Sequence, residues 1–79
     1  MAFTATRQSD GPIPDGNYAK EIWRYSNTGG SSGGVITATW LKTIDLVVGA
    51  YLDRTISTNQ VTLTTNTNST GEVELFGRV

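Results

Sequence analysis

The chain has 79 residues, enough for one domain, and a net charge of −1 from six basic and seven acidic residues that are interleaved along it. It contains no Cys and no His, which excludes disulfides and argues against a structural zinc site. It has neither a clustered basic stretch nor an apolar run long enough to cross a bilayer, so the sequence predicts no nucleic-acid partner and no membrane partner.

The small size of the chain predicts self-association. A domain of this length buries only about 60–65% of its unfolded surface, so a lone core is marginal. Disulfides and metals are the usual compensation, and with both set aside an oligomer is the remaining route. A well-packed monomer is the alternative. The N-terminus lacks the pattern of a signal peptide, which favours synthesis in a host cytoplasm.

Composition predicts an all-β fold. Thr is the commonest residue, and Gly, Ser and Asn are frequent, whereas the usual residues of helix surfaces are sparse. We expect a single domain over residues 1–79. Residues 1–16 would form an N-terminal arm and a Pro/Gly turn region, and residues 17–79 a β body with a flexible Gly/Ser loop at 28–34.

The first seven residues alternate loosely, as in a short strand or an extended arm that lies on a neighbouring subunit. The turn dipeptides Asp10-Gly11 and Asp15-Gly16, together with Pro12 and Pro14, then predict a turn region. Ile13, between the two prolines, is expected to lie under this loop.

Residues 17–27 are predicted to form a strand. Period two places Tyr18, Ile22 and Arg24 on one face and Trp23 and Tyr25 on the other, so neither face is purely apolar. A helical period would instead gather Tyr18, Ile22 and Tyr25, so one short helix is the alternative. Mixed faces with Tyr, Trp and Arg suit an interface strand. The candidate interface residues are Phe3, Tyr18, Trp23, Arg24 and Tyr25.

The Gly/Ser block at residues 29–34 is interpreted as a loop, since a phosphate cradle would need a following Lys-Ser/Thr and a helix. Residues 35–53 should form the centre of the sheet. The facing changes near residues 41–43, which suggests a bend or bulge between two strands. Ile44, Leu46 and Val48 fall on one apolar face, and Tyr51-Leu52 is expected in the core, before a turn at Asp53-Arg54.

The end of the chain predicts a hairpin from about Gln60 to Arg78. Val61 and Leu63 alternate with threonines, a polar turn follows at residues 66–71, and Val73 and Leu75 alternate with Glu72 and Glu74.

The sequence predicts no active site and no cofactor. Without His or Cys, the usual base and thiol nucleophile are missing. The two carboxylate pairs, Asp10 with Asp15 and Glu72 with Glu74, have neither catalytic nor calcium-ligand spacing. The function that remains is interaction through sheet edges and aromatic side chains.

The second half of the chain resembles small virion proteins encoded with the structural genes of tailed bacteriophages. The Gly-rich stretch at residues 29–34 leads to a Val-x-Thr-x-x-x-Leu step and an apolar strand, then to an alternating Val-Thr-Leu-Thr strand and a terminal Phe76-Gly77-Arg78. The resemblance covers residues 28–79; residues 1–27 match nothing that we can name. It implies a compact β-sandwich or jelly-roll-like barrel on the capsid, often trimeric, and no catalytic residues.

The leading hypothesis is therefore a non-enzymatic capsid decoration or cement protein, located in the virion. Its partners would be itself, as a trimer rather than a dimer, and the major capsid protein. The alternatives are a head–tail connector or tail component, and a glycan- or peptide-binding module that uses Trp23, Tyr25 and Trp40 as a platform.

Overall fold

The computed structural model describes residues 2–79, apart from the side chains of Ala2 and Asp15. Strands are the only regular elements of these residues, so the all-β prediction is confirmed, and residues 18–25 lie in a strand rather than in the alternative helix. The strands are β1 (Ala2–Arg7), β2 (Ile13–Asp15), β3 (Tyr18–Thr28), β4 (Gly33–Thr37), β5 (Thr43–Gly49), β6 (Asp53–Ser57), β7 (Gln60–Thr64) and β8 (Ser69–Arg78).

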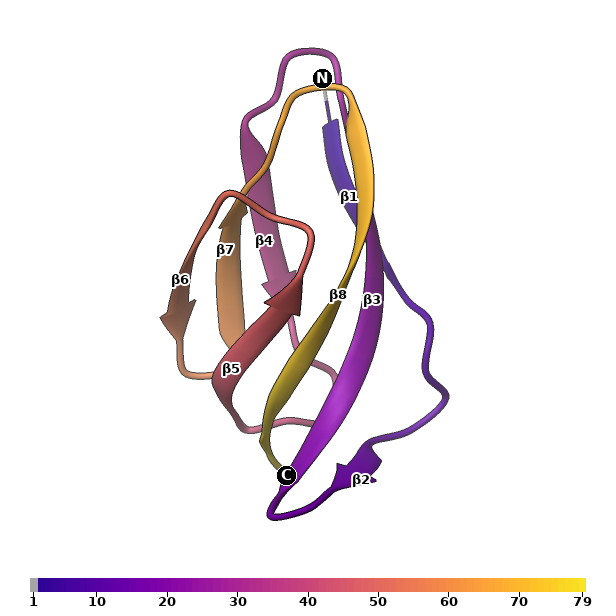
Figure 1. Ribbon diagram of the computed structural model, residues 1–79, viewed down its shortest axis with the longest axis vertical. Coiled ribbons are helices and arrows are strands. Elements are labelled where there is room, and N and C mark those ends of the chain that lie inside the picture. Colours follow the sequence, from indigo (N-terminus) through magenta and orange to yellow (C-terminus); the bar gives the residue numbers. More distant parts are fainter. Residues whose placement is uncertain (1) are drawn as a thin grey trace.

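The strands form two antiparallel sheets that pack into a small sandwich (Figure 1). The five-stranded sheet has the order β1-β3-β8-β5, and β2 pairs with the part of β3 that β1 leaves open. The three-stranded sheet has the order β4-β7-β6. At the two sides of the sandwich β1 contacts β4 and β5 contacts β6. The prediction of a small antiparallel sandwich is thus confirmed, and the sheets do not close into a barrel.

The core lies between the sheets and follows from alternation along the central strands. Val73 and Leu75 of β8 face Val61 and Leu63 of β7, and each is at most 1% exposed. Phe3 and Tyr25 extend this core and stack with ring centroids 5.6 Å apart. The inner face of β3 also contains two polar residues, Glu21 and Asn27, that are completely buried.

Four connections run between the two sheets, and we call each of them a crossover. Side chains on the inner face of β3 form hydrogen bonds to all four. The Glu21 carboxylate accepts hydrogen bonds from backbone N–H groups of the β4–β5 crossover, at residues 38–42. The Tyr25 hydroxyl donates to the carbonyl of Ala50 in the β5–β6 crossover, at 2.7 Å. The Asn27 amide donates to Ser31 in the β3–β4 crossover and to Thr65 and Asn66 in the β7–β8 crossover.

The predicted loop at residues 28–34 is wrong at both ends. Thr28 belongs to β3, and Gly33 and Gly34 belong to β4. The two glycines are needed for close approach, because a Cβ at Gly33 would overlap the carbonyl of Leu63 and one at Gly34 would overlap the Phe3 ring. What remains, residues 29–32, is tied by hydrogen bonds to Asn27 and Asn68.

The predicted hairpin from Gln60 to Arg78 is also wrong. Both strands exist, but β7 and β8 lie in opposite sheets. β7 pairs instead with β6, through a tight turn at residues 58–59 where Thr58 has a φ of 56°. Sequence alternation cannot tell these arrangements apart, because each strand buries one face in both.

Residues 35–53 do not form the centre of a sheet. They contribute β4 and β5, which are edge strands, while β3, β8 and β7 are central. At the bend predicted near residues 41–43, the chain leaves one sheet and crosses to the other through residues 38–42. The bulge lies further along, within β5, between Ile44 and Leu46. Leu52 is 64% exposed rather than core, and Asp53-Arg54 begins β6 rather than a turn.

Candidate interaction surface

The outer face of the five-stranded sheet presents two rows of neighbouring side chains at its lower end in Figure 1. The antiparallel register aligns Leu46 of β5, Phe76 of β8 and Lys20 of β3 in the first row. It aligns Val48, Glu74 and Ile22 of the same strands in the second row. Ile13 of β2 extends the first row, beside Lys20, and Tyr18 lies just beyond it on β3.

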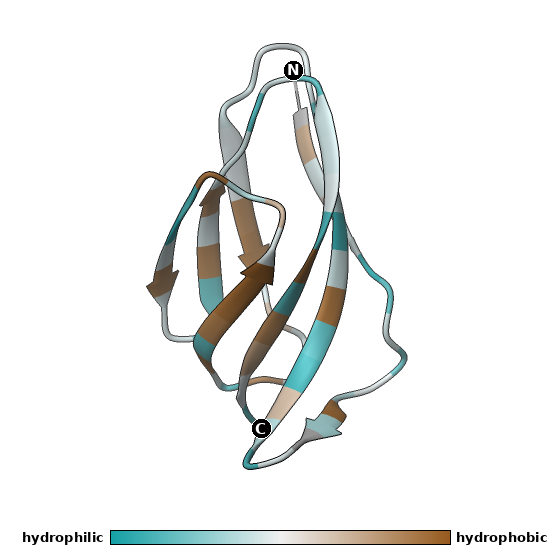
Figure 2. Ribbon diagram, viewed as in Figure 1, coloured by the Kyte–Doolittle hydropathy of each residue, from teal (hydrophilic) through white to brown (hydrophobic). Residues whose placement is uncertain are grey.

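These rows form an apolar patch that the sandwich leaves open. Tyr18, Leu46 and Val48 are 42%, 46% and 48% exposed, and the other apolar members are half-buried. In Figure 2, β5 is brown along most of its length, brown and teal bands alternate on the lower part of β8, and the lower part of β3 is mostly teal below one brown band. Contiguous exposed apolar side chains of this kind mark binding surfaces more often than isolated ones do. We call the set Ile13, Tyr18, Ile22, Leu46, Val48 and Phe76 the apolar patch.

Charged side chains of both signs lie within and beside the patch. Lys20 Nζ is 3.7 Å from a carboxylate oxygen of Glu74 and 5.7 Å from the centre of the Phe76 ring. Arg78 Nε is 3.7 Å from a carboxylate oxygen of Asp45 at the edge. Two positive and two negative charges therefore balance, so the patch favours neither an anionic nor a cationic partner.

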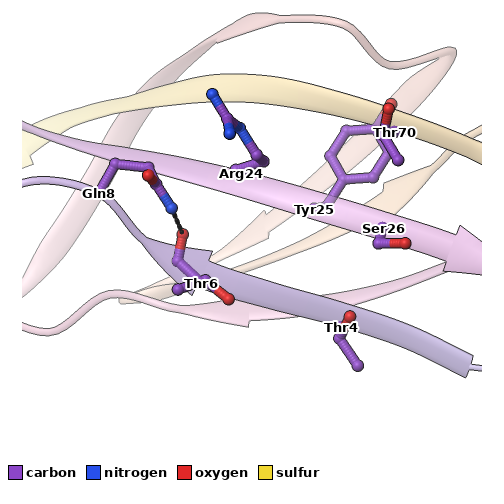
Figure 3. Close-up of a pocket in the computed structure, with 7 residues that line it drawn as sticks. All are labelled: Thr4, Thr6, Gln8, Arg24, Tyr25, Ser26 and Thr70. Carbon is purple, nitrogen blue, oxygen red and sulfur yellow. Dashed lines mark hydrogen bonds between the residues drawn. The ribbon is translucent and has the colours of Figure 1, made fainter.

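The upper half of the same outer face is hydrophilic. Thr4, Ser26 and Thr70 form one row across β1, β3 and β8, and Thr6, Arg24 and Glu72 form the next. A shallow hollow of ≈ 240 Å³ lies over this region (Figure 3). Within it Gln8 donates to the carbonyl of Thr6 at 3.1 Å. Hydroxyl groups on a sheet are well hydrated, and we find nothing there that selects a ligand.

The outer face of the three-stranded sheet is polar as well. Thr62 of β7 lies between Val35 of β4 and Thr55 of β6, and Gln60 lies between Thr37 and Ser57. Val35, at 52%, is the exposed large apolar side chain on these strands. Among the two outer faces, the apolar patch is therefore confined to the lower half of the five-stranded sheet.

Glu21 is the one buried carboxylate among the described side chains, and its oxygens are fully engaged. Oε1 accepts from the indole N–H of Trp23 at 3.0 Å and from the backbone N–H of Thr39 at 2.9 Å. Oε2 accepts from the backbone N–H groups of Trp40 and Leu41 at 2.6 and 2.9 Å. Burial raises the pKa of Glu21, but these four donors outweigh it and hold the pKa below its usual value. A carboxylate held in this way is a structural anchor rather than a base for catalysis.

Arg7 of β1 contacts the same β4–β5 crossover that Glu21 holds. Its guanidinium carbon lies 4.4 Å from the centre of the Trp40 ring, and Nη1 donates to Thr39 Oγ1 at 3.1 Å. The ring of Trp40 is therefore partly covered, and Trp23 is half-buried beside Glu21. Because Tyr25 is only 4% exposed, these three aromatic residues do not form the platform expected of a glycan-binding module.

No group of three or more potential metal-ligating side chains occurs among the described residues. Within residues 2–79 we also find no helix with the length and apolar character needed to span a bilayer.

The candidate interface residues fall into two sets. Tyr18 and Arg24 point to the outer face and are exposed, Tyr18 at the edge of the apolar patch and Arg24 in the hydrophilic half. Phe3, Trp23 and Tyr25 lie on the inner face. Tyr25 is buried and stacks on Phe3, so neither its ring nor its hydroxyl is available to a partner.

Of the six patch residues, sequence analysis named only Tyr18 as an interface candidate. It missed Ile13, Ile22, Leu46, Val48 and Phe76. Strict alternation groups Leu46 and Val48 with Ile44 as one apolar face. The bulge reverses the facing after Ile44, so Ile44 and Val47 are buried and Leu46 and Val48 are exposed. Phe76 could have been found, since it continues the outward series of Glu72 and Glu74.

Comparisons with protein-family models, with curated proteins and with solved structures found no match to this chain.

Proposed function

We propose that this chain is a non-enzymatic structural protein of a tailed-bacteriophage virion, a decoration or cement protein that binds the outer capsid and stabilises it through self-association. The observation that supports this most directly is the apolar patch on a small two-sheet body. It adds to the resemblance of residues 28–79 to such proteins. The same patch would also suit a head–tail connector.

The patch has the layout of a protein-binding surface. Its apolar side chains surround one ion pair, Lys20 with Glu74, and a second ion pair, Arg78 with Asp45, lies at its edge. It is built on four paired strands, β2, β3, β8 and β5, so the backbone is already fixed before a partner binds, and little conformational entropy is lost on docking. Weak contacts of this size become effective when many copies bind a symmetric shell.

The carboxylates support a role without chemistry. Glu21 has all of its acceptor positions near the crossover occupied. Glu72 and Glu74 lie on the outer face in ion pairs with Arg24 and Lys20, at 3.5 and 3.7 Å. Acid–base catalysis at pH 7 requires a carboxyl group whose pKa is raised toward neutrality, whereas the pKa of the buried Glu21 is lowered by its four donors. The proposed partners are other copies of the chain and the major capsid protein. The resemblance implies a trimer, whereas the two rows of the apolar patch favour a pair of copies.

The test is binding to capsids. Virions of the phage that carries the gene, prepared without this protein, are incubated with the purified chain, sedimented and imaged by electron microscopy. We expect added density on the capsid lattice. We expect Leu46→Asp to abolish binding, because it disrupts the patch through which copies would associate on the shell. Leu52→Asp, a matched change of an exposed leucine outside the patch, should leave binding unchanged.

Density at the tail vertex would favour the connector or tail alternative instead. Failure of the wild-type chain to sediment with particles of any kind would contradict a role in the virion.

A further inference from the structure

We propose that the apolar patch is covered by the apolar patch of a second copy of this chain, about a two-fold axis that runs across the strands of the five-stranded sheet. This inference rests on the proposed self-association and deepens it: the patch is assigned to the contact between copies, so the dimer would meet the capsid through another surface. It can be tested without a capsid.

The two rows of the patch make this axis possible. Placed between the rows, the axis lays the first row of one copy over the second row of the other. Leu46 then lies over Val48 of the second copy and Val48 over its Leu46, so the two most exposed aliphatic side chains of β5 cover each other. On β3, the stem of Lys20 lies over Ile22 of the second copy, and such stems pack well on apolar surface.

The charges select this axis over the alternative. With the axis across the strands, Glu74 lies over Phe76 of the second copy, and the nearest cation from that copy is Lys20, one strand away. Each Glu74 can therefore pair with Lys20 of either copy. An axis parallel to β8 would instead place Glu74 directly against Glu74, and buried like charges are strongly unfavourable.

A second copy also matches the patch in charge and shape. Lys20 and Arg78 balance Asp45 and Glu74, so a partner of one sign gains little, whereas a copy presents the same balanced set. The faces of two sheets with the same twist pack about 10 Å apart with their strands nearly aligned. The pairing would add a second core, which a chain of 79 residues with no disulfide can use.

The first test is the mass of the full-length chain in solution by sedimentation velocity over a concentration series. We expect a dimer for the wild type and a monomer for Val48→Asp. Val35→Asp is the matched control, because Val35 is equally exposed on a strand of the other sheet, and we expect it to remain a dimer. A monomeric or trimeric wild type, a dimeric Val48→Asp, or a monomeric Val35→Asp would each overturn the proposal.

A charge exchange tests the axis even if Val48→Asp fails to fold. Lys20→Glu should weaken the dimer at least tenfold, since it places like charges across the interface, and Lys20→Glu combined with Glu74→Lys should restore it. If the double variant dimerises no better than Lys20→Glu alone, the assigned geometry is wrong.

Cross-linking provides a direct test of register, because the chain contains no cysteine of its own. We expect a mixture of Leu46→Cys chains and isotopically labelled Val48→Cys chains to form mainly mixed disulfide dimers on mild oxidation. Equal amounts of all three dimers would overturn the proposed axis. A wild-type monomer that still binds capsids would refute this inference and leave the proposed capsid binding standing, with the patch facing the capsid.

Discussion

A carboxylate holds the crossover at the lower end of the sandwich, and a carboxamide holds those at the upper end. Glu21 and Asn27 lie on the same face of β3 and are both fully buried. The crossover at residues 38–42 turns three N–H groups inward, so it needs an acceptor with several lone pairs. The crossovers at residues 29–32 and 65–68 turn the carbonyls of Ser31 and Asn66 inward, so they need a donor. The polarity of the backbone at each end thus decides which polar residue can be buried there.

Glu21→Gln is expected to have the largest effect on stability. The amide retains one acceptor but turns its NH₂ group toward backbone N–H donors, so at least two hydrogen bonds to a charged group are lost. We expect a loss of about 3 kcal/mol in the free energy of unfolding. Urea denaturation followed by tryptophan fluorescence measures it.

Glu74→Gln is the control for removal of a carboxylate charge, because Glu74 is in a partly exposed ion pair on the outer face. We expect it to change the stability of the monomer by less than about 1 kcal/mol. Equal losses for the two variants would contradict the anchoring role of Glu21.

Asn27→Asp is expected to cost somewhat less, about 2–3 kcal/mol at neutral pH. Either carboxylate oxygen that replaces Nδ2 would face the carbonyls of Ser31 and Asn66 and the hydroxyl of Thr65. The acid form regains a donor, so the pKa of the new carboxyl group should be raised by folding, and the loss should shrink as the pH falls. An Asn27→Asp loss that grows on acidification would contradict this arrangement.

The wild-type chain should show the opposite dependence at its lower end. Folding lowers the pKa of Glu21, so its ionised form stabilises the fold at pH values above its unfolded pKa, about 4.3. That contribution is lost as the pH falls from about 4.3 through the lower pKa of the folded state. Thermal unfolding between pH 3 and pH 7 should therefore be less pH-dependent in Glu21→Gln than in the wild type. Parallel profiles would show that the ionisation of Glu21 is not coupled to folding.

The smallest effect is expected for Arg24→Ala, in the hydrophilic half of the outer face. Arg24 and Glu72 form an exposed ion pair at 3.5 Å, with 64% and 53% of their side chains accessible. We expect less than about 0.5 kcal/mol change in the free energy of unfolding, by the same urea denaturation. A loss approaching that of Glu21→Gln would mean that the outer face contributes far more than this geometry allows.

Alternation along the chain was sufficient to predict the fold class and most strands. It predicted the strand around residues 18–27 with Tyr18, Ile22 and Arg24 on one face, and the structure confirms it. It could not predict which sheet each strand joins. The crossovers between the sheets are held by Glu21 and Asn27 through partners that lie 18 to 39 residues away for all but one bond, and a period-two pattern contains no information on such pairs.

The apolar patch was harder to predict, because one extra residue in β5 determines which of its side chains face the solvent. The bulge between Ile44 and Leu46 exchanges the inner and outer faces of β5, and nothing in the residue types at this point signals an insertion. The sequence located interface-type residues on β3, but only Tyr18 among them borders the patch. Alternation placed Leu46 and Val48 on the same apolar face as Ile44, and the bulge separates them from it.

Because side chains of β3 hold all four passages between the layers, the strands that these passages join are expected to unfold together. Detaching β3 would release the passages at both ends together, so partial opening would give little that is still folded. Native-state hydrogen exchange should therefore show the amides of Thr39, Leu41 and Thr65 exchanging at one common rate set by global denaturation. A protein built in this way resists local nicking by proteases until it unfolds as a whole.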